Sequence, residues 1–334
     1  MTKELELSEV VSLFKNILSV RMENGGVRPL RFTEKQFARF EGNRDRMIRA
    51  LSPAGVTLDF ITDASSVSIG LLFDGYARPH ASIDIMIDGA VTASVSVKRP
   101  MGEQISVIPI EGSGERRVTL LLPHTACYVI KSMVLENCTV LKKAEALSKR
   151  IISFGDSITQ GMDALKPSSI FSATFGKFFK AEVLNLGVGG YVFDAELIDG
   201  DAEFKPDLIT VAYGTNDWSL KNGENFRQGC TAFLKKLTEV YPGIPKIVIT
   251  PFWRLDGDEK NGAGTLQEAG KQIKSCAEVY SDIIVVDGYE VSPHMPEFYG
   301  DLYLHPSDEG FQRIAVNILC SLVSRKEIIL FLQQ

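Results

Sequence analysis

Between about residues 29 and 143, apolar and polar positions alternate along short segments. The alternating apolar residues include Val56, Leu58, Phe60, Val67, Ile69, Leu71, Phe73, Ile83, Ile85 and Ile87. A period of two is typical of β-strands that bury one face. Asp88-Gly89, between two of these runs, predicts a hairpin turn because both residues tolerate positive φ. Since no helical periodicity interrupts the region, we expect an antiparallel, jelly-roll-like β-sandwich domain at residues 29–143.

The pattern changes at residue 144, inside a polar linker. Short apolar runs occupy residues 151–154, 182–186, 208–212, 246–250 and 283–286. Segments with apolar residues at helical spacing separate most of these runs, and one of them carries Phe171, Phe175, Phe178 and Phe179. Strands that alternate with amphipathic helices predict a parallel sheet covered on both faces. We therefore expect a three-layer α/β/α domain at residues 144–334, with its five-stranded sheet in the flavodoxin-like order 2-1-3-4-5.

The first 28 residues form a third segment. Apolar residues recur at helical spacing, at Leu7, Val10, Val11, Phe14, Ile17 and Leu18, and Asn24-Gly25-Gly26 follows. This pattern predicts one amphipathic helix over residues 4–22 that ends before the glycines. We expect its apolar face to pack on a domain of the same chain. The alternative is a membrane-surface helix, which a polar face without marked basic character does not favour.

Length and composition limit the partners. At 334 residues the chain is long enough to bury two hydrophobic cores. Its formal net charge of -6 argues against a nucleic-acid partner, which favours a basic face. No apolar run is long enough to span a bilayer, and the N-terminus lacks a signal-peptide pattern. We therefore expect a cytoplasmic protein without a membrane partner, while its oligomeric state stays open.

The sequence contains no pattern typical of a metal or cofactor site. The five cysteines are scattered without C-x-x-C spacing, which predicts neither a disulfide framework nor a zinc site. Gly187 and Gly189 do not begin a dinucleotide-binding motif, because Val192 occupies its final glycine position. We expect neither a metal nor a cofactor.

The candidate chemistry begins at Ser157. The apolar run at 151–154 breaks at Gly155 and is followed by Asp156 and Ser157. In an open α/β sheet, ligands bind in the crevice beyond the carboxyl ends of the strands, so this serine is well placed to act as a nucleophile. The alternative is that Ser157 only caps the next helix, as serine often does.

Three further segments favour the nucleophile. They are LNLGVGGY (184–191), AYGTND (212–217) and DLYLHPSDEGF (301–311). Together with GDSIT they resemble, in the same order, the four blocks of the SGNH hydrolases, also called GDSL esterases. The matching residues are Ser157, Gly190, Asn216 and His305, and the resemblance covers roughly residues 145–325. It implies a serine esterase, here of the two-domain type in which a β-sandwich precedes the hydrolase, as in carbohydrate acetyl esterases.

The resemblance also implies a role for each residue. Ser157 is the nucleophile, and His305 is the general base that a serine needs at neutral pH. The N–H groups of Ser157 and Gly190 and the side-chain amide of Asn216 are the donors for the oxyanion. The acid departs from the family pattern D-x-x-H, because Asp301 lies four residues before His305. Either the loop bulges and Asp301 completes a triad, or the site is a Ser-His dyad.

The expected substrate is a small molecule or oligosaccharide that carries a short acyl ester, in particular an acetyl ester of a carbohydrate. Tyr191 and Trp253 follow predicted strands, and we expect these rings to bind substrate by narrowing the acyl side or stacking on a sugar. One alternative is a lipase- or thioesterase-like acyl hydrolase. Another is a glycan-binding protein with a vestigial hydrolase domain.

Overall fold

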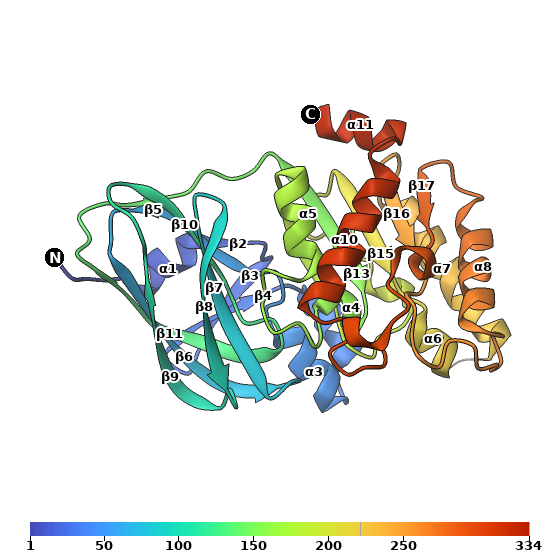
Figure 1. Ribbon diagram of the computed structural model, residues 1–334, viewed down its shortest axis with the longest axis horizontal. Coiled ribbons are helices and arrows are strands. Elements are labelled where there is room, and N and C mark those ends of the chain that lie inside the picture. The colour runs from blue at the N-terminus through green and yellow to red at the C-terminus, as the bar shows by residue number, and fades with distance from the viewer. Residues whose placement is uncertain (221, 334) are drawn as a thin grey trace.

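The computed structural model contains two domains side by side, a β-sandwich in the N-terminal half and an α/β domain in the C-terminal half (Figure 1). It describes residues 1–220 and 222–333, and only the backbone of Lys98. In the described part of the chain, no helix is long and apolar enough to cross a membrane. The fold class predicted from the pattern is confirmed.

Two antiparallel sheets of six strands form the sandwich. The first contains β3 (Ser19–Glu23), β4 (Gly26–Leu30), β11 (Ala126–Glu136), β6 (Ser66–Tyr76) and β9 (Gly102–Pro109) in that order, and β1 (Lys3–Glu4) pairs with β11. The second contains β12 (Leu141–Lys143), β5 (Thr57–Thr62), β10 (Arg116–Leu121), β7 (His80–Ile87) and β8 (Ala90–Lys98), and β2 (Phe14–Lys15) pairs with β5. Asp88 (φ 49°) and Gly89 (φ 85°) form the expected hairpin turn between β7 and β8.

The prediction of one helix over residues 4–22 is wrong. The helix α1 covers only Leu7–Leu13, and the chain becomes extended at Phe14, where β2 begins. Asn24 (φ 50°) and Gly25 (φ 68°) do not stop a helix but turn the chain from β3 into β4. Val10 and Leu13 are buried in the sandwich core, so the segment belongs to that domain. Cross-strand pairing here outweighs a local helical pattern, as tertiary context often does.

Short helices also occur where only strands were expected. They are α2 (Glu34–Phe37), the 3-10 helix η1 (Ala38–Phe40) and α3 (Arg44–Leu51). Thr33 caps α2 through a capping box, and the Asn43 side chain caps α3. Phe32 and Phe40 pack in one core with Tyr191 of the α/β domain. The segment at 30–51 therefore packs with the α/β domain, although its position in the sequence suggested the sandwich.

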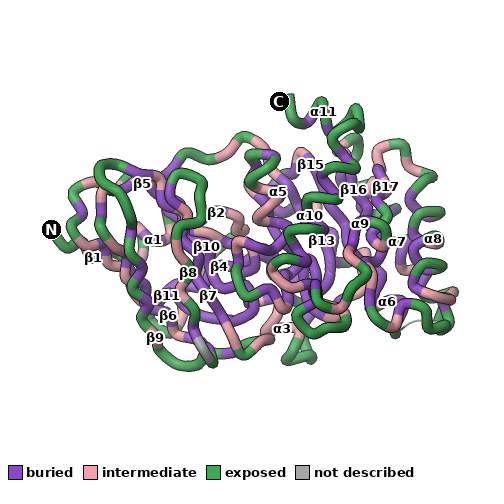
Figure 2. The backbone as a smooth tube through the Cα atoms, viewed as in Figure 1, coloured by how far each residue is buried: buried purple, intermediate pink, exposed green. Residues whose placement is uncertain are grey.

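The α/β domain is built on a parallel sheet with the strand order β14-β13-β15-β16-β17. These strands are β13 (Lys149–Gly155), β14 (Ala181–Gly187), β15 (Leu208–Ala212), β16 (Lys246–Ile249) and β17 (Ile283–Val286). One face is covered by α5 (Phe171–Phe179), α10 (Asp308–Leu322) and α11 (Lys326–Gln333), and the other by α7 (Gly223–Val240) and α8 (Leu266–Ala277). Figure 2 shows the sheet as the buried centre of this domain. The predicted order 2-1-3-4-5 is confirmed.

We predict that Phe40→Ala lowers the free energy of unfolding by about 3–5 kcal/mol, because the ring is fully buried between Phe32 and Tyr191. Urea denaturation followed by tryptophan fluorescence measures the change. The matched control is Ile105→Ala, since Ile105 on β9 is 69% exposed and its removal should change stability by less than about 0.5 kcal/mol. A loss below about 1 kcal/mol for Phe40→Ala would contradict the packing of this segment on the α/β domain.

Candidate active site

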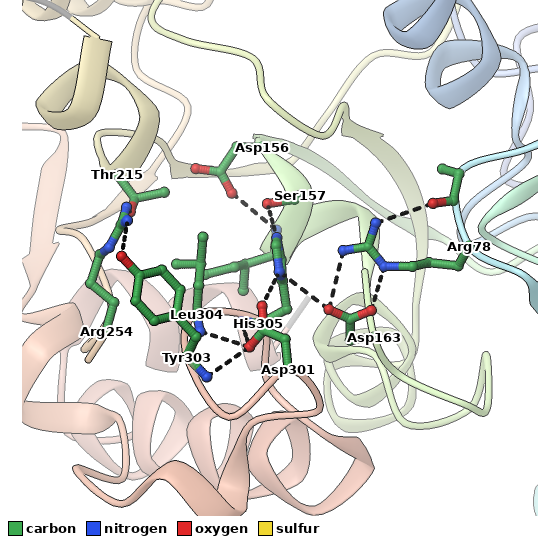
Figure 3. Close-up of polar contacts among 12 residues, drawn as sticks. Arg78, Asp156, Ser157, Asp163, Thr215, Arg254, Asp301, Tyr303, Leu304 and His305 are labelled. Atoms are coloured by element: carbon green, nitrogen blue, oxygen red, sulfur yellow. Dashed lines mark hydrogen bonds and ion pairs between the residues drawn. The ribbon is translucent and has the colours of Figure 1, made fainter. Parts of the chain in front are cut away.

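Ser157 is the first residue of α4 (Ser157–Gln160), directly after the central strand β13. Asp156 caps this short helix, and its Oδ1 accepts a hydrogen bond from the N–H of Ile158 at 3.0 Å. Burial raises the pKa of the Asp156 carboxyl to about 7. The cap is therefore Asp156, and the side chain of Ser157 turns toward His305 instead (Figure 3).

Two glycines let α4 lie against the strand ends. A Cβ at Gly155 would lie 1.9 Å from Thr159 Oγ1, and a Cβ at Gly187 would lie 2.4 Å from the backbone nitrogen of Gln160. Gly155 pairs with Gly187 on one side and with Ala212 on the other, so β13, β14 and β15 end at the same edge of the sheet. The turns after these strands, which carry Ser157, Gly190 and Asn216, start from this edge.

His305 joins the site from the loop before α10. Its Nε2 lies 2.9 Å from Ser157 Oγ, and its Nδ1 lies 2.7 Å from Asp301 Oδ2. Leu302 has a left-handed backbone (φ 58°), which bulges the loop and brings Asp301 to the ring despite the extra residue. Of the two geometries left open by the sequence, the structure has the one with the bulge. When Nδ1–H donates to Asp301, Nε2 is the ring nitrogen that can accept a hydrogen bond from the Ser157 hydroxyl.

Asp301 is held in place by its own loop. Its Oδ1 accepts hydrogen bonds from the N–H groups of Tyr303, Leu304 and His305 at 2.9, 2.7 and 3.0 Å. Burial alone raises the pKa of this carboxyl, but the bonds from the His305 ring and the three N–H groups outweigh it and hold the pKa well below its usual range. The carboxylate is therefore ionised whenever the ring is neutral.

A second carboxylate contacts the same ring nitrogen. Asp163 Oδ2 lies 3.2 Å from His305 Nδ1, and Arg78 of the sandwich forms an ion pair with both Asp163 oxygens (Figure 3). Burial lowers the pKa of His305, but the hydrogen bonds to Asp163 and Asp301 outweigh it, so the pKa lies above its ordinary value. Neither Asp163 nor Arg78 could be identified from the sequence, because neither belongs to a motif or a periodic pattern.

Three hydrogen-bond donors lie at the turns beyond the strand ends. Within the described residues, the backbone N–H groups of Ser157 and Gly190 donate to no protein group. The Asn216 side chain, on α6 (Thr215–Leu220), donates to the carbonyl of Tyr191 at 3.0 Å and so joins this turn to the Gly190 turn. Because a primary amide has two N–H bonds, Asn216 keeps a second donor.

Residues 153–313 match the model of the GDSL-like Lipase/Acylhydrolase family. The α/β domain belongs to the GDSL-like Lipase/Acylhydrolase family. Residues 153–313 thus form an ester-hydrolase domain of the SGNH type, as the four sequence blocks predicted. No curated protein matches the chain.

Solved structures share both domains. A salicylyl-acyltransferase from a tetracycline biosynthetic pathway is 18% identical, with a TM-score of 0.78 over 93% of this chain and 95% of that one. A family two carbohydrate esterase from Cellvibrio japonicus is 17% identical, with a TM-score of 0.68 over 99% of each chain. An acetyl xylan esterase from Butyrivibrio proteoclasticus is 16% identical, with a TM-score of 0.59 over 96% of this chain and 97% of that one. At such identities the likeness shows a shared two-domain fold.

Of the two rings expected to bind substrate, the ring of Tyr191 lies in a hydrophobic core and the ring of Trp253 lies in the loop after β16. Tyr191 is only 2% exposed, its ring packs on Phe40, and its hydroxyl donates to Asp194 at 2.6 Å. The prediction that Tyr191 narrows the acyl side of the GDSL-like site is therefore wrong, because its ring belongs to the core shared with residues 30–51. Trp253 is half-buried. Its ring stacks on His294 and packs against Tyr299, and both of these partners lie shortly before His305 in the sequence.

Buried and half-buried polar side chains hold the Gly190 turn of this GDSL-like domain. Gln160 Oε1 accepts a hydrogen bond from the N–H of Gly189 at 2.9 Å, and Arg49 Nη1 donates to the Gly189 carbonyl at 2.9 Å. The fully buried Arg31 guanidinium donates to the carbonyls of Asn185 and Gly187 just before the turn. Burial lowers the pKa of Arg31 to about 9. Arg31 and Arg49 come from the N-terminal half, so sequence distance concealed them.

We predict that Gly187→Ala lowers the free energy of unfolding by about 1–3 kcal/mol, because the added methyl group would collide with the backbone of α4. Chemical denaturation measures the loss. The matched control is Gly270→Ala in α8, where the nearest atoms lie 3.5 Å away and alanine should be neutral or stabilising by up to about 1 kcal/mol. Equal stability of the Gly187→Ala variant and the wild type would show that α4 does not need this close approach.

Proposed function

We propose that this protein is a serine esterase that removes short acyl groups, in particular acetyl groups, from a carbohydrate or a similar hydroxylated small molecule. The proposal rests on two consecutive hydrogen bonds through the His305 ring. One joins Ser157 Oγ to His305 Nε2, and the other joins His305 Nδ1 to Asp301. This order of groups is the arrangement by which a serine hydroxyl is activated for acyl transfer.

In the proposed mechanism, Ser157 Oγ attacks the ester carbonyl while His305 Nε2 takes the hydroxyl proton. The same nitrogen then gives the proton to the leaving alcohol, and an acyl-Ser157 ester remains. Water, deprotonated by His305, attacks this ester and releases the carboxylic acid and the free serine. Asp301 stays ionised throughout, holds the ring tautomer and stabilises the imidazolium.

The proposed oxyanion donors are the N–H groups of Ser157 and Gly190 and the second N–H of Asn216. Ser157 is the first residue of α4, where backbone N–H groups have no partner within the helix. Removing one such donor typically costs about 3 kcal/mol of transition-state stabilisation. The link from Asn216 to Tyr191 would keep the Asn216 amide and the Gly190 N–H in fixed relation.

The choice of substrate rests on the relatives of the same two-domain fold, which include a family two carbohydrate esterase and an acetyl xylan esterase. Since Tyr191 is buried, Trp253 is the remaining candidate from the sequence for a ring that contacts substrate. A lipase- or thioesterase-like acyl hydrolase is the alternative enzyme. A glycan-binding protein with a vestigial hydrolase domain is the alternative outside catalysis.

The test is release of acetate from a panel of acetylated mono- and oligosaccharides by the wild type and by Ser157→Ala. We predict turnover by the wild type and none by the variant, because no other described residue supplies the nucleophile beside His305. Circular dichroism and thermal melting verify that the variant is folded. Turnover by folded Ser157→Ala would contradict the mechanism, and a preference for octanoyl over acetyl esters would favour the lipase or thioesterase alternative.

We predict that Asn216→Ala lowers kcat by about 10²–10³ and changes KM less, because the amide engages the oxyanion mainly in the transition state. Steady-state kinetics on the best acetyl ester measures both constants. Asn225→Ala is the matched control, since Asn225 lies on the exposed side of α7. If Asn216→Ala changes KM alone, Asn216 binds substrate and is not an oxyanion donor.

A further inference from the structure

Asp163 connects the sandwich to the His305 ring. It follows α4 in a turn, has a left-handed backbone (φ 69°), and directs its carboxylate between Arg78 and His305 (Figure 3). Its Oδ2 lies 3.1 Å from Arg78 Nη2 and 3.2 Å from His305 Nδ1. Arg78 belongs to the loop between β6 and β7, so it reaches this site from the other domain.

The two loops approach closely because of a glycine. A Cβ at Gly300 would lie 2.9 Å from the Cβ of Asp163, and the Gly300 N–H donates to the His305 carbonyl at 2.8 Å. The His305 loop therefore lies directly against the Asp163 turn. This contact fixes the ring nitrogen near the second carboxylate.

The sandwich is anchored along the segment that follows Asp163. Ser82 on β7 donates to the carbonyl of Leu165 at 2.6 Å, and Asp84 Oδ2 accepts from the N–H of Ser168 at 2.9 Å. On its other side, the segment is held by Asp308 of α10, whose Oδ1 accepts from the N–H groups of Leu165 and Lys166. Sandwich, Asp163 turn and His305 loop thus form one connected unit.

We propose that Arg78 and Asp163 are a positioning pair for His305, so that the β-sandwich domain completes the active site. The inference rests on the proposed role of His305 as general base. Asp163 gives Nδ1–H a second acceptor, which limits rotation of the ring. Arg78 offsets the added negative charge, because two uncompensated carboxylates would hold the ring as an imidazolium that cannot accept the Ser157 proton.

The charges that face His305 come from several elements. Asp301 lies on its own loop, Asp163 follows α4, and Asp156 caps α4. Arg78 forms an ion pair with Asp163. Arg254, from the loop after β16, lies 3.4 Å from the hydroxyl of Tyr303, which is on the same loop as Asp301. Burial raises the pKa of Asp163, but the bonds from His305 and Arg78 outweigh it and lower the pKa to about 2. Asp163 is therefore ionised over the range in which His305 titrates.

The experiment is a titration of the His305 ring by NMR in the full-length protein. The chain has four histidines, and the His305 signal is assigned by its loss in His305→Gln. We expect Asp163→Asn to lower the His305 titration midpoint by about one pH unit, and Arg78→Gln to raise it by a similar amount. In the Asp163→Asn/Arg78→Gln double variant, the midpoint should match that of Asp163→Asn, because Arg78 acts through Asp163. The acid limb of the kcat/KM profile should move in the same directions.

Matched controls come from another ion pair between the domains. Lys15 on β2 and Glu182 at the start of β14 are 3.6 Å apart, at the opposite end of the strand from Gly187. Lys15→Gln and Glu182→Gln remove the same charges without approaching His305, so they should leave its midpoint unchanged.

Three outcomes would overturn the inference: an unchanged midpoint in Asp163→Asn, shifts of the same sign in both single variants, or equal shifts in the Glu182→Gln control. If Arg78→Gln does not fold, the Asp163→Asn titration decides alone, since its expected shift does not require a change at Arg78. The ring titration needs no turnover. An inactive wild type with the expected shifts would therefore contradict the proposed function and leave the positioning pair supported.

Discussion

The close approach of α4 to the ends of β13 and β14 is the constraint on which the site depends. It exists because Gly155 and Gly187 have no Cβ, so helix backbone and strand backbone come into contact. This contact sets Ser157 at the edge where three parallel strands end in register. From this edge Ser157 Oγ lies 2.9 Å from Nε2 of His305, which is 148 residues away along the chain.

Much of this arrangement could be predicted from the sequence because its signals are local. Each strand of the parallel sheet is a short apolar run, and each site block follows such a run or begins a helix. The reach of Asp301 could not be predicted, since it depends on the left-handed backbone at Leu302. The helix predicted over residues 4–22 does not form at that length, because pairing with distant strands outweighs the helical spacing. The burial of Tyr191 could not be predicted, because its packing partner Phe40 lies 151 residues earlier in the sequence.

The sandwich and the segment at 30–51 do more than precede the hydrolase. Arg31 and Arg49 hold the Gly190 turn from one side, and Arg78 contacts Asp163 from the other. Their guanidinium groups meet carbonyls or a carboxylate in partly or fully buried surroundings, where such hydrogen bonds are stronger than in water. The N-terminal half therefore supports the geometry of a site whose motif residues all lie in the C-terminal half.

The proposed mechanism depends on Ser157 as the nucleophile and on His305 as the base that activates it. Labelling with a fluorophosphonate, followed by peptide mapping by mass spectrometry, tests the claim most directly, because the reagent bonds to an activated serine oxygen. We predict one label per chain on Ser157, parallel loss of esterase turnover, and no label in His305→Gln. A label on another residue, or full turnover after Ser157 is labelled, would contradict the account.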